Sequence, residues 1–173
     1  MAHEFLASFC GGNLVPAPAD APEAGDKPCG ITFLKGRGAA AFDDTDEEAA
    51  FTPRFVMPSQ YAGGTLKATI GLLFDTETDV EDEAVFDIRV EAVTAGDALD
   101  LTAAHSFDSA NVCEVDPPAT AGYETEVTVT LANKDSVAAG DRVVVAIRRD
   151  TDHENDSAAG DVFVTTIELW EET

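Results

Sequence analysis

Oxygen-bearing side chains recur at every second position in two acidic stretches of the chain. One runs from Asp150 to Asp156 in the order Asp-Thr-Asp-His-Glu-Asn-Asp, and the other spans residues 75–83. Calcium loops space their ligands in this way, although an EF-hand needs glycine at its sixth position, where Asn155 and Val80 stand. Solvated acidic loops are therefore the first interpretation, and a calcium site is the alternative. The candidate calcium ligands are Asp150, Asp152 and Asp156.

Patterns that support catalysis are missing from the sequence. The histidines (His3, His105 and His153) fall in a terminal segment and two expected loops, with no His-x-His pair, nucleophile elbow or phosphate-binding loop. Two carboxylates would suffice for a glycosidase, but 34 acidic residues make that requirement uninformative. One Trp and two Tyr are few aromatic residues for a sugar cleft. We therefore expect a protein that is not an enzyme and holds no resident cofactor.

Three cysteines, Cys10, Cys29 and Cys113, are irregularly spaced. An odd number with this spacing fits neither a disulfide framework nor a metal motif. Free thiols in a protein assembled in a reducing cytoplasm are the first interpretation. A Cys10–Cys29 disulfide that ties down the N-terminal segment is the alternative.

The net charge of −24, with 34 acidic and ten basic residues, excludes two kinds of partner. Nucleic-acid binding relies on Lys and Arg that neutralise phosphates, and anionic lipid also repels an acidic surface. We expect neither DNA nor membrane contact, and no apolar run is long enough to span a bilayer. Abundant Asp with scarce Lys favours a saline, marine or halophilic setting.

The first thirty residues differ in composition from the rest. Residues 13–30 contain four of the eight prolines and almost no large apolar side chain, which predicts an extended segment without a core of its own. Before it, Phe5, Leu6 and Phe9 form a small apolar patch. We interpret residues 1–30 as an arm whose patch docks on a neighbouring surface, either of this chain or of another.

From residue 31 onward the pattern is that of β-strands. Residues 85–93 and 123–131 alternate between apolar and polar side chains, which marks strands with one wet face. Glycine-rich and proline-rich turns separate the segments, and no substantial helix is expected. Seven or eight strands then imply a two-sheet sandwich over residues 31–173. The expected strands are 31–34, an irregular stretch around 51–57, 66–74, 85–93, 123–131, 143–147 and 162–169, with 99–104 as a weaker candidate.

Two positions near the C-terminus bear on packing. The string Asp-Ser-Val-Ala-Ala-Gly-Asp at 135–141 is echoed at 156–161, and each copy precedes an apolar strand. Trp170 is interpreted as closing one end of the core, with an interface anchor as the alternative.

The C-terminal part of the chain resembles a family of tailed-phage virion proteins. The similarity covers residues 50–170 and is carried by Ile147-Arg148-Arg149-Asp150, an acidic loop, and Ala159-Gly160-Asp161 before a final strand. Upstream, residues 55–58 and 63–66 resemble that family's entry into its sandwich. Residues 1–49 have no such counterpart.

The resemblance implies a jelly-roll-like antiparallel β-sandwich of about eight strands with an extended N-terminal arm. It implies a homotrimer that binds the major capsid protein and decorates the outer surface of the virion, after assembly in the host cytoplasm. No catalytic residue is implied. The alternative is a tail-, vertex- or fibre-associated module that binds a host surface glycan or protein.

Overall fold

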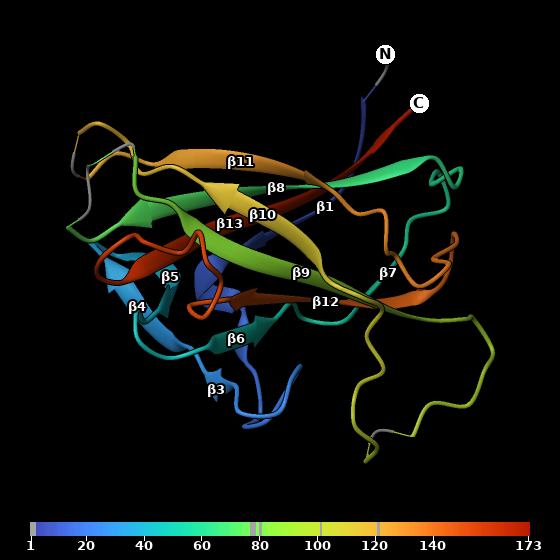
Figure 1. Ribbon diagram of the computed structural model, residues 1–173. Helices are drawn as coiled ribbons and strands as arrows, with labels where there is room; N and C mark the ends of the chain where they lie inside the picture. The colour runs from blue at the N-terminus through green and yellow to red at the C-terminus, as the bar shows by residue number, and fades with distance from the viewer. Residues whose placement is uncertain (1–2, 77–78, 80, 101, 121) are drawn as a thin grey trace.

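The computed structural model describes residues 3–76, 79, 81–100, 102–120 and 122–173. These residues form two β-sheets packed face to face, as Figure 1 shows. The predicted all-β, jelly-roll-like sandwich is therefore confirmed. Within the described ranges, no helix is long and apolar enough to cross a membrane.

Sheet A is the upper layer in Figure 1 and has the order β11-β8-β13-β5-β4, with β1 also beside β13. All its strand pairs are antiparallel. The last strand, β13, is central to this sheet. It pairs with β8 along one side, and along the other side its first part pairs with β5 and its second part with β1. The strands are β1 (His3–Cys10), β4 (Gly30–Leu34), β5 (Arg37–Phe42), β8 (Thr65–Phe74), β11 (Thr125–Thr130) and β13 (Val162–Glu172).

Sheet B is the lower layer and has the order β10-β9-β12-β6-β2. Two short strands add to it, β3 beside β6 and β7 beside β12. A single 3-10 turn, η1 (Gly11–Asn13), links β1 to β2. The strands are β2 (Val15–Pro16), β3 (Lys27–Pro28), β6 (Glu48–Phe51), β7 (Phe55–Val56), β9 (Ala84–Val93), β10 (Asn111–Val115) and β12 (Arg142–Arg149).

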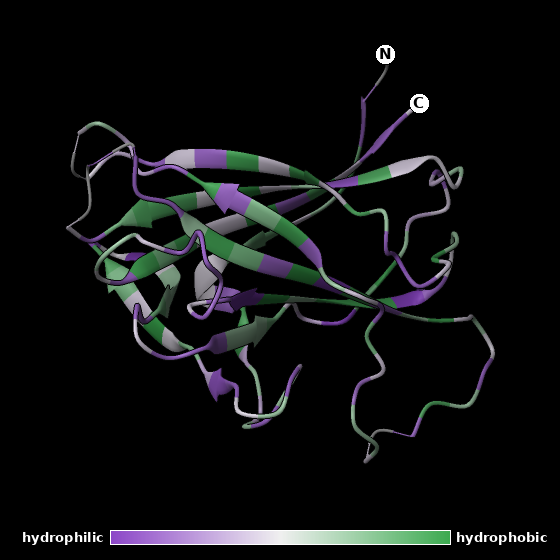
Figure 2. Ribbon diagram, in the orientation of Figure 1, coloured by the Kyte–Doolittle hydropathy of each residue, from purple (hydrophilic) through white to green (hydrophobic). Residues whose placement is uncertain are grey.

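The core lies between the sheets and follows directly from the period-2 patterns. In β8 the inward residues Leu66, Ala68, Ile70 and Leu72 are buried, while Thr65, Lys67 and Thr69 face outward. Figure 2 shows the same alternation as green bands between purple or white ones along the strands. Each fully buried large aliphatic side chain contributes roughly 1.5–3 kcal/mol to folding.

Residues 3–30 belong to the sandwich in the described structure. β1 pairs with β13 over most of its length, and Leu6 is buried in the core. Residues 15–28 then cross to sheet B, where β2 and β3 pair with β6. The arm is therefore docked on this chain's own body, and a division into a separate arm and sandwich is not visible in the packing.

Candidate functional site

The two outer faces of the sandwich differ in whether anything covers them. On sheet B the outward residues Phe51, Val144 and Ala146 are buried beneath Ala17, Ala21 and Phe107, which come from the N-terminal segment and from the loop after β9. Phe51 also contacts the ring of His105, and His105 Nδ1 lies 2.6 Å from Glu91 Oε2. Sheet B is therefore closed on its outer side over much of its width.

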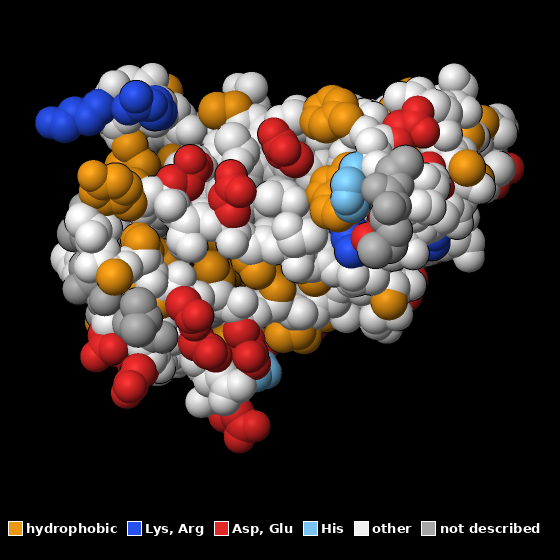
Figure 3. All heavy atoms as spheres, turned by 90° about the horizontal axis from the view of Figure 1, so that it is seen from above, with side chains coloured by type: hydrophobic (Ala, Val, Ile, Leu, Met, Phe, Trp, Pro, Cys, Tyr) orange, Lys and Arg blue, Asp and Glu red, His pale blue; other side chains and the backbone are white. Residues whose placement is uncertain are grey.

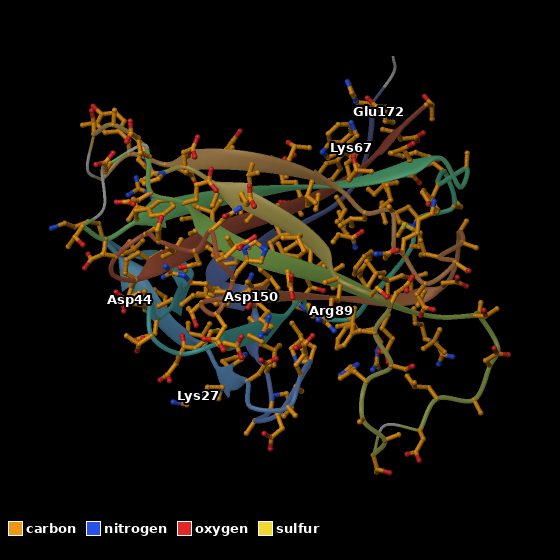
Figure 4. All side chains as sticks on the ribbon, in the orientation of Figure 1. Lys27, Asp44, Lys67, Arg89, Asp150 and Glu172 are labelled. Atoms are coloured by element: carbon orange, nitrogen blue, oxygen red, sulfur yellow. The ribbon has the colours of Figure 1, made fainter. Side chains whose placement is uncertain are left out.

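A buried arginine holds the N-terminal segment against sheet B. Arg148 Nε donates to Asp26 Oδ1 at 2.8 Å, and its Nη1 donates to Asp87 Oδ2 at 3.1 Å and lies 3.3 Å from Asp150 Oδ1. Asp26 and Arg148 are both buried, so this ion pair is shielded from solvent. Burial raises the pKa of the Asp87 carboxyl above its ordinary value, and the Arg148 guanidinium partly counteracts this. Figure 4 labels Asp150 and Arg89, which belong to this side of the molecule.

The outer face of sheet A is open. Strands β1, β13, β8 and β11 lie side by side, and their outward side chains form a surface about 14 Å wide at ~4.8 Å per strand. Figure 3 looks down on sheet A and shows separate hydrophobic and acidic side chains on this face. We call this surface the platform; its residues are Phe5, Ser8, Lys67, Thr69, Thr128, Thr130, Glu168 and Trp170.

One row of the platform is aromatic. Phe5 is opposite Trp170 in the β1–β13 register, and 57% of its surface is exposed. The Trp170 ring meets the His3 ring edge-on at 4.6 Å, and Lys67 Nζ lies 5.1 Å from its centroid. Lys67 Nζ also pairs with Glu172 Oε2 at 2.8 Å, and Figure 4 shows these two residues close together. This row therefore presents the apolar ring of Phe5 to a ligand, with the charged pair Lys67 and Glu172 at its edge.

The next row consists of hydroxyl groups and a carboxylate. Trp170 Nε1 donates to Thr69 Oγ1 at 3.0 Å, and Thr69 Oγ1 lies 2.9 Å from Thr128 Oγ1. Glu168 is opposite Thr69 and is exposed. Hydroxyls both donate and accept, and a carboxylate accepts strongly, so this row can bond a ligand rich in hydroxyl groups.

A glycine in mid-strand marks a third row. The register of β13 shifts between Val164 and Thr166, so the two consecutive residues Thr165 and Thr166 both approach Gly71 of β8. A Cβ at Gly71 would lie 2.6 Å from Thr166 Oγ1 and 2.7 Å from Glu124 Oε1, and Thr165 Oγ1 bonds the same Glu124 oxygen. Only glycine leaves room for these polar groups to converge.

The end of the platform is braced by a buried carboxylate. Glu171 is fully buried and accepts from the backbone N–H groups of Ala62 and Gly64. Lys134 Nζ donates to Gly64 O and to Tyr61 Oη, each at 2.8 Å. A shallow hollow lies beside this turn and continues from the platform; it is lined by Gly63, Thr65, Leu66, Thr130, Ala132 and Lys134.

The structure separates the three residues of the predicted N-terminal patch. Phe5 is exposed on the platform, Leu6 is in the core, and Phe9 packs inward with its ring 5.2 Å from that of Phe55. Trp170 lies on the outer face of sheet A, so its interpretation as the closure of the core is wrong. The sequence pattern did not indicate the threonine row, because it depends on pairing between β11 and β8.

Two of the three candidate calcium ligands pair with arginines. Asp156 accepts from Arg149 at 2.9 and 3.1 Å, and Arg149 is fully buried. Asp150 lies beside Arg148, and Asp152 is exposed. Within the described ranges, no group of three or more metal-ligating side chains comes together. The acidic loop therefore uses two of its three candidate carboxylates in ion pairs.

The three cysteines are free thiols. Cys10 is exposed at the end of β1, and its Sγ lies 3.5 Å from Gly38 O. Burial raises the pKa of Cys29 and that of Cys113 each to about 12. The alternative of a Cys10–Cys29 disulfide is not what the structure describes.

Comparison with known proteins places the fold. No protein-family model matches the chain, and no curated protein matches it. Among solved structures, it is similar to a xylan-binding module, CBM15, with a TM-score of 0.52 and 13% identity over 98% of this chain and 99% of that one. It is also similar to the K1 cleaved adhesin domain of Lys-gingipain from Porphyromonas gingivalis W83, with a TM-score of 0.51 and 14% identity over 97% and 99% of the two chains. A third similar structure is CBM28, a carbohydrate-binding module specific for non-crystalline cellulose. It has a TM-score of 0.50 and 12% identity over 93% of this chain and 89% of that one.

These TM-scores show a shared architecture, and identities of 12–14% extend the likeness to the fold alone. The chain is a two-sheet sandwich of the same kind as these modules, over nearly the full length of both partners.

Proposed function

We propose that this protein is a non-catalytic binding module whose platform binds an extended, neutral polysaccharide. The observation that carries the proposal is the open outer face of sheet A, where an exposed aromatic side chain lies next to a row of hydroxyls and a carboxylate. Aromatic rings pack against the apolar face of a sugar ring, while hydroxyls and carboxylates bond its equatorial groups. A flat face suits a chain-like ligand.

The charge of the platform defines the class of saccharide. Glu124, Glu126 and Glu168 lie on it or at its edge, whereas its one lysine, Lys67, is already paired with Glu172. Uronic-acid and sulfated chains would meet uncompensated carboxylates, so we expect them to bind more weakly than neutral chains. The xylan-binding and cellulose-specific modules with this fold support the proposal by analogy of architecture.

Affinity electrophoresis against soluble neutral and anionic polysaccharides tests the proposal. We expect retardation by at least one neutral polysaccharide, and a loss of about tenfold in affinity on Phe5→Ala, because one desolvated aromatic contact contributes roughly 1–2 kcal/mol. Phe33→Ala is the matched control, since Phe33 is equally aromatic and 72% exposed but lies on β4, away from the platform. Binding of anionic chains alone, or equal loss in both variants, would contradict the proposal.

A second proposal concerns where such a module works. The resemblance of residues 50–170 to tailed-phage virion proteins supports a place on a virus particle, as a trimeric capsid decoration protein or as a tail-, vertex- or fibre-associated module. Glycan binding by the platform would favour the tail-, vertex- or fibre-associated module over the capsid decoration protein. Copy number in purified particles distinguishes them, because hundreds of copies mean capsid and a few tens mean tail or vertex.

A further inference from the structure

The β4–β5 hairpin combines an unpaired strand edge with the protein's most exposed phenylalanine. β4 is the last strand of sheet A and pairs only with β5 among the described strands. Phe33 is 72% exposed and Ile31 is 38% exposed. Exposed apolar side chains on a free edge are uncommon, because such an edge is a template for another strand.

The hairpin register shows which backbone groups are free. Lys35 and Gly36 form a two-residue turn with φ of 53° and 89°, so the flanking pair Leu34–Arg37 is the hydrogen-bonded one. Bonding alternates along an antiparallel ladder, which makes Thr32–Ala39 the next bonded pair. The N–H and C=O groups of Ile31 and Phe33 therefore point away from β5 to the open side.

The tip of the same hairpin is cationic and unpaired. Within the part of the chain that the structure describes, Lys35 and Arg37 are exposed and take part in no ion pair or side-chain hydrogen bond. By contrast, Lys27, Lys67, Arg148 and Arg149 are all paired with carboxylates. Figure 3 shows Lys and Arg side chains projecting from one corner of the face, beside hydrophobic ones. Among the exposed basic residues that the structure describes, Lys35 and Arg37 both lack a carboxylate partner, in a chain with ten basic and 34 acidic residues.

We propose that the β4 edge is a docking site for an extended acidic segment of a partner protein, which adds to sheet A as a further strand. The free groups of Ile31 and Phe33 supply backbone hydrogen bonds, and the two side chains supply apolar contact. Lys35 and Arg37 fix the direction of the added strand by pairing with carboxylates at its end. A second copy of this chain fits less well, because two molecules of net charge −24 repel each other.

The probe is a synthetic eight-residue peptide of alternating Glu and Val, with a Gln-Val peptide as its neutral counterpart, titrated into the full chain and followed by amide NMR. We expect shifts at Ile31, Phe33 and their β5 partners, and at least tenfold weaker binding of the Gln-Val peptide. Phe33→Pro removes the outward N–H and the exposed ring without removing a hydrogen bond to β5, so we expect it to abolish binding. The surface double variant Lys35→Glu, Arg37→Glu should weaken binding at least tenfold without lowering Tm.

Phe5→Ala is the control variant, because it alters the platform and leaves β4 unchanged. Equal binding of both peptides, shifts confined to other strands, or unaltered binding by the charge-reversal variant would overturn the proposal. A dimer of the free chain that Phe33→Pro dissociates would also overturn it, since the edge would then pair with a second copy.

Discussion

Arg148 is the residue on which the closed side of the sandwich depends. It is 4% exposed at its side chain and faces Asp26, Asp87 and Asp150 from three different segments. Such a buried pair contributes little net stability when complete, but removing one partner leaves uncompensated buried charge. We therefore interpret the cluster as structural: it holds residues 17–28 against sheet B through ion pairs.

Replacing Arg148 with Met should lower the free energy of unfolding by about 3–5 kcal/mol at neutral pH. Without the guanidinium, the folded-state pKa of Asp87 rises further above its unfolded value. A raised carboxyl pKa means that the folded state binds more protons, so the deficit should shrink as the pH falls toward the unfolded pKa near 4. Urea unfolding at neutral and mildly acidic pH measures both effects.

Arg142→Met provides the control for this change, because Arg142 is partly exposed and its Nη2 donates only to the Asp97 carbonyl. We expect a change within about 0.5 kcal/mol there. A deficit for Arg148→Met that is equally large at both pH values would contradict the charge argument.

The thiols allow a second test at the residue scale. Because thiolates are the reactive form and burial raises the pKa of Cys29 and Cys113, only exposed Cys10 should react with a thiol reagent in the native protein at about pH 8. All three should react in denaturant without reductant. Two native reactive thiols, or only one in denaturant, would contradict the described arrangement.

β1 is the element whose role changes most between sequence and structure. It extends sheet A beside β13 and inserts Leu6 into the core at a register shift between Phe5 and Ala7. That shift breaks the period-2 pattern, so the apolar residues looked like a patch for docking on a neighbour. The segment that was expected to be an arm is therefore a strand of sheet A.

Leu6→Ala should therefore destabilise the fold by about 2–5 kcal/mol, the usual cost of a large-to-small change in a core. Phe5→Ala, one position away on the open face, should cost less than about 1 kcal/mol. Chemical denaturation of the two variants measures the contrast. Equal small effects would show that β1 does not contribute to the core.

Other strands show where sequence patterns suffice. β8 and β11 were predictable because one face of each is wet. β9 was predictable from its alternation, but the expected wet face is wrong, because Asp87 and Glu91 are buried under the segments that cover sheet B. β12 appeared as a continuous apolar run because both of its faces are covered. β5 and β6 are rich in alanine, which has little β preference, so their bounds were not predicted. Of residues 99–104, those that the structure describes are not in a strand.

The platform was only half predictable for a related reason. The alternation in β11 indicates a face of polar side chains, and Gly71 within an apolar strand indicates a close approach. Neither observation says that Thr128, Thr69 and Trp170 meet. Thr69 is 59 residues from Thr128 and 101 residues from Trp170 in the sequence. Their contact depends on strand pairing, which a local sequence pattern does not reveal.

At the scale of the whole molecule, net charge opposes compactness. With 34 acidic and ten basic residues the surface repels itself, and salt screens this repulsion as the Debye length falls from about 10 Å at 0.1 M to about 3 Å at 1 M. We expect Tm at neutral pH to rise by a few degrees over this range of NaCl, as calorimetry would measure. Near the isoelectric point of about 4.1 the increase should vanish. An equal increase at both pH values would contradict an electrostatic cause.

The whole account depends on which face of the sandwich binds a ligand, and the protein carries its own reporter. Trp170 is the only tryptophan, and it lies on the platform with its Nε1 bonded to Thr69. Titration of a neutral polysaccharide that the protein binds should change Trp170 fluorescence in a saturable way. The Kd from fluorescence should equal the Kd from calorimetry, and Phe5→Ala should raise both Kd values about tenfold. Calorimetric binding that leaves Trp170 emission unchanged and is indifferent to Phe5→Ala would place the ligand elsewhere and contradict the proposed role of sheet A.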